Sequence, residues 1–497
     1  MRTITAIFTI LALLPDCYHG IEIDGDASTT AAPEIAVDPT TTTTASGSED
    51  AGDAPTTSAG DSSSGAPDGL EHIDRCGRCG CTDWVAQAPS PSLGAELRVD
   101  LAPMPDGGVL LAAAGAEMLE LRRFDSAGAL QWSRSIAGAV SDLHVAAVGD
   151  GFYLLAGSFT STIELAADDP SAQLTSAGGS DGFVAFHSET GGGAPIWQRT
   201  VGAPGEQRIT DIALTGACDG DELSGCRVHL AGVAVGDLGL IDAAPAGDAA
   251  DFFVVGLPAV NADASAAWSL RLPSGAVSPP APSLALAGDA DLVLATTVRV
   301  MAEPGDIVVS RLGRDGSQQW TRTLAGAGEQ SNGPVAVADD GSIRLVGRTR
   351  ARADLGVGAL GQDGHETPFI AGLDAQGEPL WTRALPGWPP DRGGLAVVAD
   401  GVAVLTGHVA DAVDFGGGVL TFGGASDVFV ARYDASGAHR CSSLHGGLDI
   451  QAGLAVVRAE AHRVHLVARV RGSLAFTPGA WHASDGAEDL MISTLEL

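Results

Sequence analysis

Residues 427–441 read DVFVARYDASGAHRC, and this stretch decides the fold. It opens with an alternating apolar run and ends on Cys441. Between them lies a turn in which Asp434 precedes Gly437 by three positions, with Cys441 four positions further on. In a turn, Asp bonds its own backbone and Gly accepts a positive φ. The stretch therefore predicts two β-strands joined by a tight hairpin turn.

The same pattern recurs with tryptophan in the last position. Trp381 follows Asp374 and Gly377 at identical spacing, and an equivalent turn precedes Trp132. The anchors are Trp84, Trp132, Trp197, Trp268, Trp320, Trp381 and Cys441, and successive anchors are 48 to 71 residues apart. One four-stranded propeller blade takes roughly 40 to 50 residues plus loops, so each interval is blade-sized.

We therefore predict an all-β protein, a single β-propeller of seven four-stranded blades, with six or eight blades left open. Trp84 is an anchor without a preceding strand, whereas residues 489–495 (DLMISTL) read as a strand without an anchor. The N-terminal strand is expected to complete the last blade, because closing the ring removes open sheet edges. Trp84 should then share a sheet with residues 489–495.

The repeats resemble bacterial seven-bladed β-propeller repeat proteins of the SBBP type. The likeness is clearest at residues 413–418 (VDFGGG) and 427–434, and it covers roughly residues 84–497. Many proteins of this type resemble exported lipoproteins of uncertain function. The resemblance implies an architecture and says little about a ligand.

Residues 1–20 read as an export signal, in which Arg2 precedes an apolar stretch too short to span a bilayer. The run Leu14-Pro15-Asp16-Cys17 is similar to a bacterial lipobox, so Cys17 is the expected lipidation site. Ordinary cleavage near Gly20 is the alternative. The expected location is the outer membrane or cell surface, or otherwise the periplasm or medium, with membrane contact through the lipid alone.

Residues 21–70 are rich in Thr, Ser, Gly, Asp and Pro, and such a segment buries too little apolar surface to fold. They predict a flexible acidic tether ahead of a propeller domain at 71–497. The formal charge of −35, with 27 basic and 62 acidic residues, argues against a nucleic-acid partner, which would need clustered cations.

Six of the seven cysteines remain if Cys17 carries a lipid, and six can pair completely in an oxidising compartment. Cys218 and Cys226 are expected to close a short acidic loop. Cys76, Cys79 and Cys81 lie together, so one of them is expected to bond Cys441. A zinc site at Cys76 and Cys79 is the alternative.

Calcium is the most credible cofactor, with Asp219, Asp221 and Glu222 as candidate ligands in the loop between Cys218 and Cys226. A solvated acidic loop is the alternative. We expect no GxSxG nucleophile elbow, and the sequence has no HExxH pair and no Walker loop. A quinone-dependent dehydrogenase is a further alternative, but among the turns that precede an anchor only the turn before Trp197 has Thr directly before Gly, at Thr190.

We therefore expect a non-catalytic surface binding or scaffold protein for an unidentified protein or glycan. The alternative is an extracellular propeller enzyme, a hydrolase or dehydrogenase, with its site at the centre of the ring. Carboxylates or histidines converging within about 5 Å at one mouth of the centre would favour the enzyme. A lining of Ala, Gly and Val would favour the scaffold.

Overall fold

The computed structural model describes residues 79–497 apart from 91–96, 168, 217, 219–222, 241–249, 261–267, 301–302, 386–392, 478–479 and 485–487. The chain separates into two compact units, residues 1–66 and 67–497, and every described residue belongs to the second. The predicted export signal, the lipidation site Cys17 and the tether at 21–70 lie outside the described residues.

The main strands of the described residues form five four-stranded antiparallel sheets and one eight-stranded sheet, which we divide at its weakest link into two, and we number the resulting units as blades in chain order. Blade 1 contains β2 (Arg98–Pro103), β3 (Val109–Ala114), β4 (Met118–Phe124) and β5 (Leu130–Ala137). Blade 2 contains β6 (Val140–Ala147), β7 (Phe152–Glu164), β8 (Gln173–Ser188) and β9 (Pro195–Val201). Blade 3 contains β10 (Glu206–Thr215), β11 (Arg227–Val235), β12 (Ala250–Pro258) and β13 (Trp268–Ala276). A single pairing of Ala137 with Glu164 links blades 1 and 2.

Blade 4 contains β14 (Ser283–Ala287), β15 (Asp291–Val298), β16 (Asp306–Leu312) and β17 (Gln318–Leu324). Blade 5 contains β18 (Gln330–Val337), β19 (Ile343–Thr349), β22 (Thr367–Leu373) and β23 (Pro379–Ala384). Blade 6 contains β24 (Gly394–Val397), β25 (Ala403–Val409), β26 (Asp427–Tyr433) and β27 (His439–His445). Blade 7 contains β28 (Gln451–Glu460), β29 (Arg463–Val470), β32 (Asp489–Glu496) and β1 (Cys81–Pro89).

Minor elements decorate the loops. They are the hairpins β20 (Ala353–Asp354) with β21 (Ala359–Leu360) and β30 (Ser473–Thr477) with β31 (Ala480–Ala483), and short 3-10 helices at Pro170–Ala172, Leu223–Gly225 and Ala399–Gly401. Within the described part of the chain, no helix has the length and apolar character that crossing a membrane requires.

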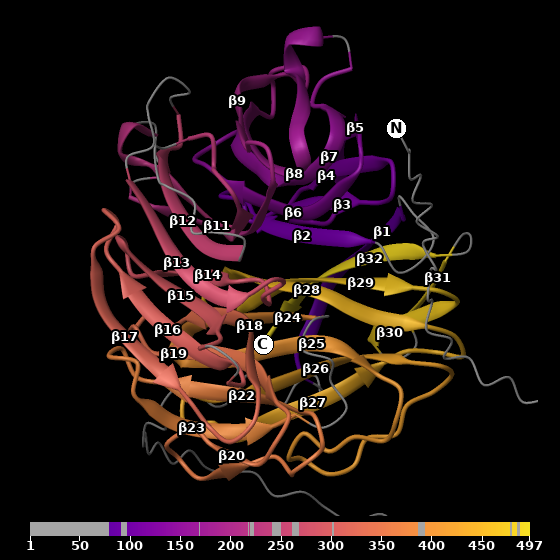
Figure 1. The fold of residues 1–497 in the computed structure, drawn as a ribbon. Coiled ribbons are helices and arrows are strands. Elements are labelled where there is room, and N and C mark those ends of the chain that lie inside the picture. Colours follow the sequence, from indigo (N-terminus) through magenta and orange to yellow (C-terminus); the bar gives the residue numbers. More distant parts are fainter. Residues whose placement is uncertain are drawn as a thin grey trace, which may run out of the picture. The chain divides into compact units, whose positions relative to one another are not determined.

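The first strand of each blade lies against the first strand of the next, so these inner strands surround a common axis. The order is β2, β6, β10, β14, β18, β24 and β28, and β28 returns to contact β2. The blades follow one another in chain order (Figure 1). This closed order confirms the predicted β-propeller.

The N-terminal strand closes the ring as predicted. β1 pairs with β32 along its length, and Trp84 lies opposite Thr494. The Gln87 side-chain amide donates to a carboxylate oxygen of Asp489 at 2.8 Å. The first and last described strands therefore belong to one sheet, and blade 7 has all four of its strands.

The second strand of each blade is packed between two neighbouring blades, which explains its composition. In β3 all six residues, Val109–Ala114, are buried. A strand covered on both faces reads as a continuous apolar run, and the small Ala side chains let adjacent blades approach closely. The outer strand β5 alternates between exposed and half-buried residues, because it lies at the rim.

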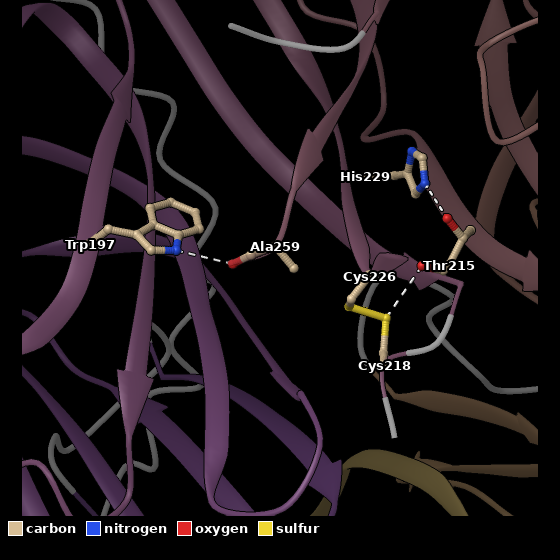
Figure 2. Close-up of a disulfide and its surroundings, with 6 residues drawn as sticks. All are labelled: Trp197, Thr215, Cys218, Cys226, His229 and Ala259. Atoms are coloured by element: carbon tan, nitrogen blue, oxygen red, sulfur yellow. Dashed lines mark hydrogen bonds between the residues drawn. A yellow bond between two sulfur atoms is a disulfide. The ribbon is translucent and has the colours of Figure 1, made fainter. Parts of the chain in front are cut away.

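The anchor tryptophans lie on the outer strands and pack on the next blade. An added Cβ on a turn glycine would lie 2.4 to 2.6 Å from the indole of the preceding blade in four cases: Gly128 and Trp84, Gly316 and Trp268, Gly377 and Trp320, Gly437 and Trp381. Trp197 donates from Nε1 to the Ala259 carbonyl of blade 3 at 3.0 Å (Figure 2), and Trp268 and Trp381 make the equivalent bond to the next blade at 2.7 and 2.9 Å. The repeated Trp and Gly are therefore two halves of one contact between blades.

Candidate functional site

Four successive inner strands carry a polar side chain at the same level of the ring. Sheet register places Asp100, His144, Asp211 and Ser283 opposite Ala112, Ala156, Ala231 and Ala295, respectively, in the second strands of blades 1 to 4. We call these four polar residues the axial row. Because adjacent inner strands are in contact, the axial row forms a continuous arc around blades 1 to 4.

Three members of the row bind backbone N–H groups of the following blade. Asp100 Oδ2 accepts from Val145 N at 2.9 Å, and Asp211 Oδ2 accepts from Leu284 N at 2.7 Å. Ser283 Oγ accepts from Val335 N at 3.1 Å. The free edge of an inner strand has unpaired N–H groups, and these side chains satisfy them. Part of the row is therefore structural.

His144 is the exception in the described part of the chain, since no such hydrogen bond to the next blade involves it. Its Nδ1 lies 3.9 Å from Asp100 Oδ2, and 19% of its side chain is exposed against 27% for Asp100. Both Asp100 and Asp211 interact electrostatically with His144. An imidazole thus lies between two carboxyl groups from neighbouring blades.

Burial controls the protonation of both carboxyl groups. It raises the pKa of Asp100 to about 6, against the opposing effects of His144 and of N–H donors from Val145 and Leu101. Burial also raises the pKa of Asp211 above its usual range. A carboxyl group with a pKa near 6 can both give and take a proton near neutral pH.

The other side of the ring is apolar at this level. In blade 6 Gly394 lies opposite Thr406, and in blade 7 Ala455 lies opposite Val467. The inner strand of blade 5 has an irregularity between Asn332 and Val335 at the same place. The centre therefore has a polar, titratable side formed by blades 1 to 4 and a small, apolar side formed by blades 6 and 7.

Two arginines lie near one end of the row. Arg98 starts β2, two residues before Asp100, and its Nε donates to the Ser141 carbonyl at 2.9 Å. Arg208 makes two hydrogen bonds to the Asp142 carboxylate, at 2.9 and 2.7 Å. Charged side chains from blades 1 to 3 therefore lie near this end of the axial row.

The structure contains two disulfides among the described residues, Cys218–Cys226 (Figure 2) and Cys79–Cys441, which confirms the expectation of disulfides. Cys81 is also disulfide-bonded. Cys76 and the candidate calcium ligands Asp219, Asp221 and Glu222 lie outside the described residues. Within the described ranges, no group of three or more His, Cys, Asp or Glu side chains is arranged to hold a metal ion.

Two buried histidines of the second strands have structural surroundings. His229 Nε2 and Thr215 Oγ1 are hydrogen-bonded at 2.8 Å (Figure 2), and His465 Nδ1 bonds Thr494 Oγ1 at the same distance. Burial lowers the pKa of each histidine to about 4. Each ring also lies beside an anchor indole, Trp268 or Trp84.

The sequence also contains the string GGSDG at residues 178–182, which matches the GxSxG spacing of hydrolase nucleophiles. In the structure it lies inside β8, where Ser180 is 6% exposed. A nucleophile elbow needs a sharp turn between a strand and a helix. This serine is therefore not placed as a nucleophile.

No family model and no curated protein matches the chain. Among solved structures, a puromycin hydrolase is 17% identical over 79% of this chain and 52% of its own, with a TM-score of 0.45. A quinoprotein alcohol dehydrogenase-like protein from Bacteroides thetaiotaomicron is 10% identical over 71% and 67%, with a TM-score of 0.36. A prolyl endopeptidase is 11% identical over 76% and 47%, with a TM-score of 0.35.

These neighbours are β-propeller proteins, and the chain spans about half the length of the puromycin hydrolase. At such identities the likeness concerns the fold alone. The comparisons contradict the expectation of a non-catalytic binding or scaffold protein, since the similar structures bear the names of hydrolases and of a dehydrogenase-like protein, and those names describe those proteins.

The physical reason for this error lies in how the axial row is built. Asp100, His144 and Asp211 come from three blades and no two are adjacent in the chain, so they form no contiguous motif. Each occupies the same place in a repeat. Alignment of the repeats on their inner strands, rather than on tryptophan, is the signal that would have found them.

Proposed function

We propose that this protein is an extracellular β-propeller hydrolase with its site in the axial row. The observation that carries the proposal is His144, whose imidazole lies 3.9 Å from Asp100 and within the field of Asp211. A carboxyl group and an imidazole lie close together on one side of the centre, and a second carboxyl group interacts electrostatically with the same imidazole, which supports the enzyme alternative.

The roles follow from the surroundings of each group. Hydrolysis needs one group that protonates the leaving group and another that takes a proton from the attacking water. Asp100 is the proton donor, since burial keeps much of this carboxyl protonated at mildly acidic pH. His144 is the base, and Asp211 stabilises the imidazolium that forms. Asp100 and His144 together supply proton transfer. This chemistry favours a hydrolase over a dehydrogenase, which transfers hydride.

The structural hydrogen bonds of Asp100 are compatible with this role. Its two oxygens accept from Leu101 N and Val145 N, both at 2.9 Å, so its position is held by two neighbouring blades. A catalytic group held by rigid strands loses little orientation during the reaction. Catalysis and ring assembly therefore use the same side chain.

The proposal is tested with panels of fluorogenic esters, glycosides and peptides, using the purified 67–497 unit and the variants His144→Gln and Asp100→Asn. We expect hydrolysis of one class by the wild type, with a loss of at least about 100-fold in kcat/KM for each variant. The control is His365→Gln, which alters a histidine outside the axial row. Full activity in His144→Gln, or no hydrolysis of any class, would contradict the proposal.

A companion proposal concerns location. We propose that the chain is an SBBP-type exported protein, carried by residues 1–20, lipidated at Cys17 and displayed on the tether at 21–70. The disulfides Cys79–Cys441 and Cys218–Cys226 support an oxidising compartment. Mass spectrometry of mature protein should find a diacylglyceryl group on Cys17, and Cys17→Ser should release the protein from membranes. An unmodified N-terminus near Ile21 is the contrary result.

We further propose that calcium binds the loop between Cys218 and Cys226 through Asp219, Asp221 and Glu222. The support is compositional, because carboxylates are the ligands that Ca²⁺ prefers. Calorimetric titration with CaCl2, compared with Asp219→Asn/Asp221→Asn, tests it directly.

A further inference from the structure

A cavity of about 250 Å³ opens between blades 1 and 2. Arg98 lines it from β2, and Ser141 and Thr160 line it from β6 and β7. The remaining walls are mainly small residues of two loops, including Gly115, Ala116 and Ala139. The cavity has room for a small polar group, and Arg98 is the charged residue of its lining.

Arg98 is exposed, and its terminal nitrogens are available on this side. The only hydrogen bond of its side chain in the described ranges runs from Nε to the Ser141 carbonyl at 2.9 Å. Ser141 is the extra residue of a β-bulge, since Val140 pairs with Phe159 and Asp142 with Ser158. The bulge frees its carbonyl from the sheet, so that this carbonyl fixes the guanidinium.

Among the described residues, no acidic side chain forms an ion pair with this guanidinium. The Asp142 carboxylate is held by two hydrogen bonds from Arg208, and no ion pair joins Arg98 to a described residue. A guanidinium with two free N–H groups at its end fits a carboxylate, which it binds with two parallel hydrogen bonds. The hydroxyl group of Thr160 adds a further donor within the cavity.

The cavity and the axial row share strands. Arg98 and Asp100 are two positions apart on β2, so their side chains leave the strand on the same face, roughly 7 Å apart along it. On β6, Ser141 precedes His144 by three positions. A ligand group held at Arg98 would therefore lie on the face of β2 from which the Asp100 side chain also projects.

We propose that this cavity is a substrate subsite that binds a carboxylate group through Arg98. The inference rests on the proposed function, whose site it completes. The substrate is then a small-acid derivative, with its hydrolysable bond a few ångströms from the carboxylate. Specificity comes from the guanidinium, while the small side chains of the two loops limit the size of the acid.

The test compares N-acetylglycine, which ends in a carboxylate, with N-acetylglycinamide, which ends in a neutral amide and is otherwise the same. Saturation-transfer NMR on the 67–497 unit should detect N-acetylglycine with a Kd on the order of 1 to 10 mM, as expected of one charge-assisted contact. The amide should bind at least about tenfold more weakly, and Arg98→Gln should remove this preference. Arg98→Lys should retain part of it, because a lysine keeps the charge without the paired N–H groups.

The matched control is Arg322→Gln on β17, which lies outside the cavity and should bind both probes as the wild type does. Equal binding of acid and amide, or an unchanged preference in Arg98→Gln with an unchanged melting temperature, overturns the subsite. Carboxylate binding without any turnover keeps the subsite and overturns the proposed function. Equal turnover of substrates with and without a carboxylate keeps the proposed function and overturns the subsite.

Discussion

Cys441 of β27 is disulfide-bonded to Cys79, two residues before β1, with Cα atoms 5.5 Å apart. The equivalent position in blade 5 carries Trp381, which packs on the turn glycine Gly437 of blade 6. Blade 7 has no such turn, because its third and fourth strands, β32 and β1, come from opposite ends of the domain. The disulfide therefore takes the place of the indole contact between blade 6 and blade 7, the blade in which strands from the two ends of the domain meet.

The first prediction concerns this disulfide. Cys79→Ser/Cys441→Ser should lower the free energy of unfolding more than Cys218→Ser/Cys226→Ser, since the sequence separations are 362 and 8. Chain entropy gives about 6 against about 2.5 kcal/mol, and native-state relaxation reduces both. Urea unfolding of the two double variants measures the difference. Equal losses would contradict a closing role for the pair.

The second prediction concerns the contact between an indole and a turn. Gly437→Ala should destabilise the domain by about 2 to 4 kcal/mol, because its φ is +74° and the new Cβ would lie 2.4 Å from the Trp381 ring. Gly364→Ala is the matched control. Its φ is +78°, but nothing lies within 4 Å, so it should cost only about 1 kcal/mol. Similar melting temperatures for the two variants would show that packing is unimportant there.

The third prediction concerns ring closure. A chain that begins at residue 91 lacks β1 together with Cys76, Cys79 and Cys81, so β32 would be left with an open edge. We expect its melting temperature to fall by more than 10 °C, or the protein to aggregate, on the order expected for losing several kcal/mol. A chain that begins at residue 67 should melt like the full-length protein. An unchanged melting temperature in the shorter chain would refute the closure.

The fourth prediction uses the raised pKa of Asp100. In the folded protein this pKa is about 6, above the unfolded value of about 3.9. The folded state thus binds the proton more tightly, and the contribution of Asp100 to stability is lost as pH rises from about 4 through 6. Relative to Asp100→Asn, the wild type should lose up to about 3 kcal/mol between pH 4 and pH 7.

Denaturant unfolding at several pH values measures this difference. Asp339→Asn provides the opposite case, since the hydrogen bond from Arg458 holds the pKa of Asp339 below its usual range. The wild type should gain stability relative to this variant as pH rises through the acidic range. A flat difference for Asp100→Asn would mean that the carboxyl is solvated like a surface group.

Much of the fold could be read from the sequence because the signals are local and repeated. The Asp-x-x-Gly turn and the anchor four positions later sit within single hairpins, and in the structure Asp434 Oδ1 accepts from Ser436 N and Ala438 N as such a turn requires. Ring closure could also be inferred, because an anchor without a strand and a strand without an anchor complement each other. These features depend on neighbours in the chain.

Only the tertiary structure shows which residues of different blades contact one another. The sequence could not show that Trp381 covers Gly437 of the next blade, or which of the clustered cysteines reaches Cys441. Nor could it show that His144 lies 3.9 Å from Asp100 and interacts electrostatically with Asp211. Each of these side chains is unremarkable within its own strand. Their proximity depends on the stagger and closure of the whole ring, which brings one position of several repeats to a common axis and buries carboxyl groups there.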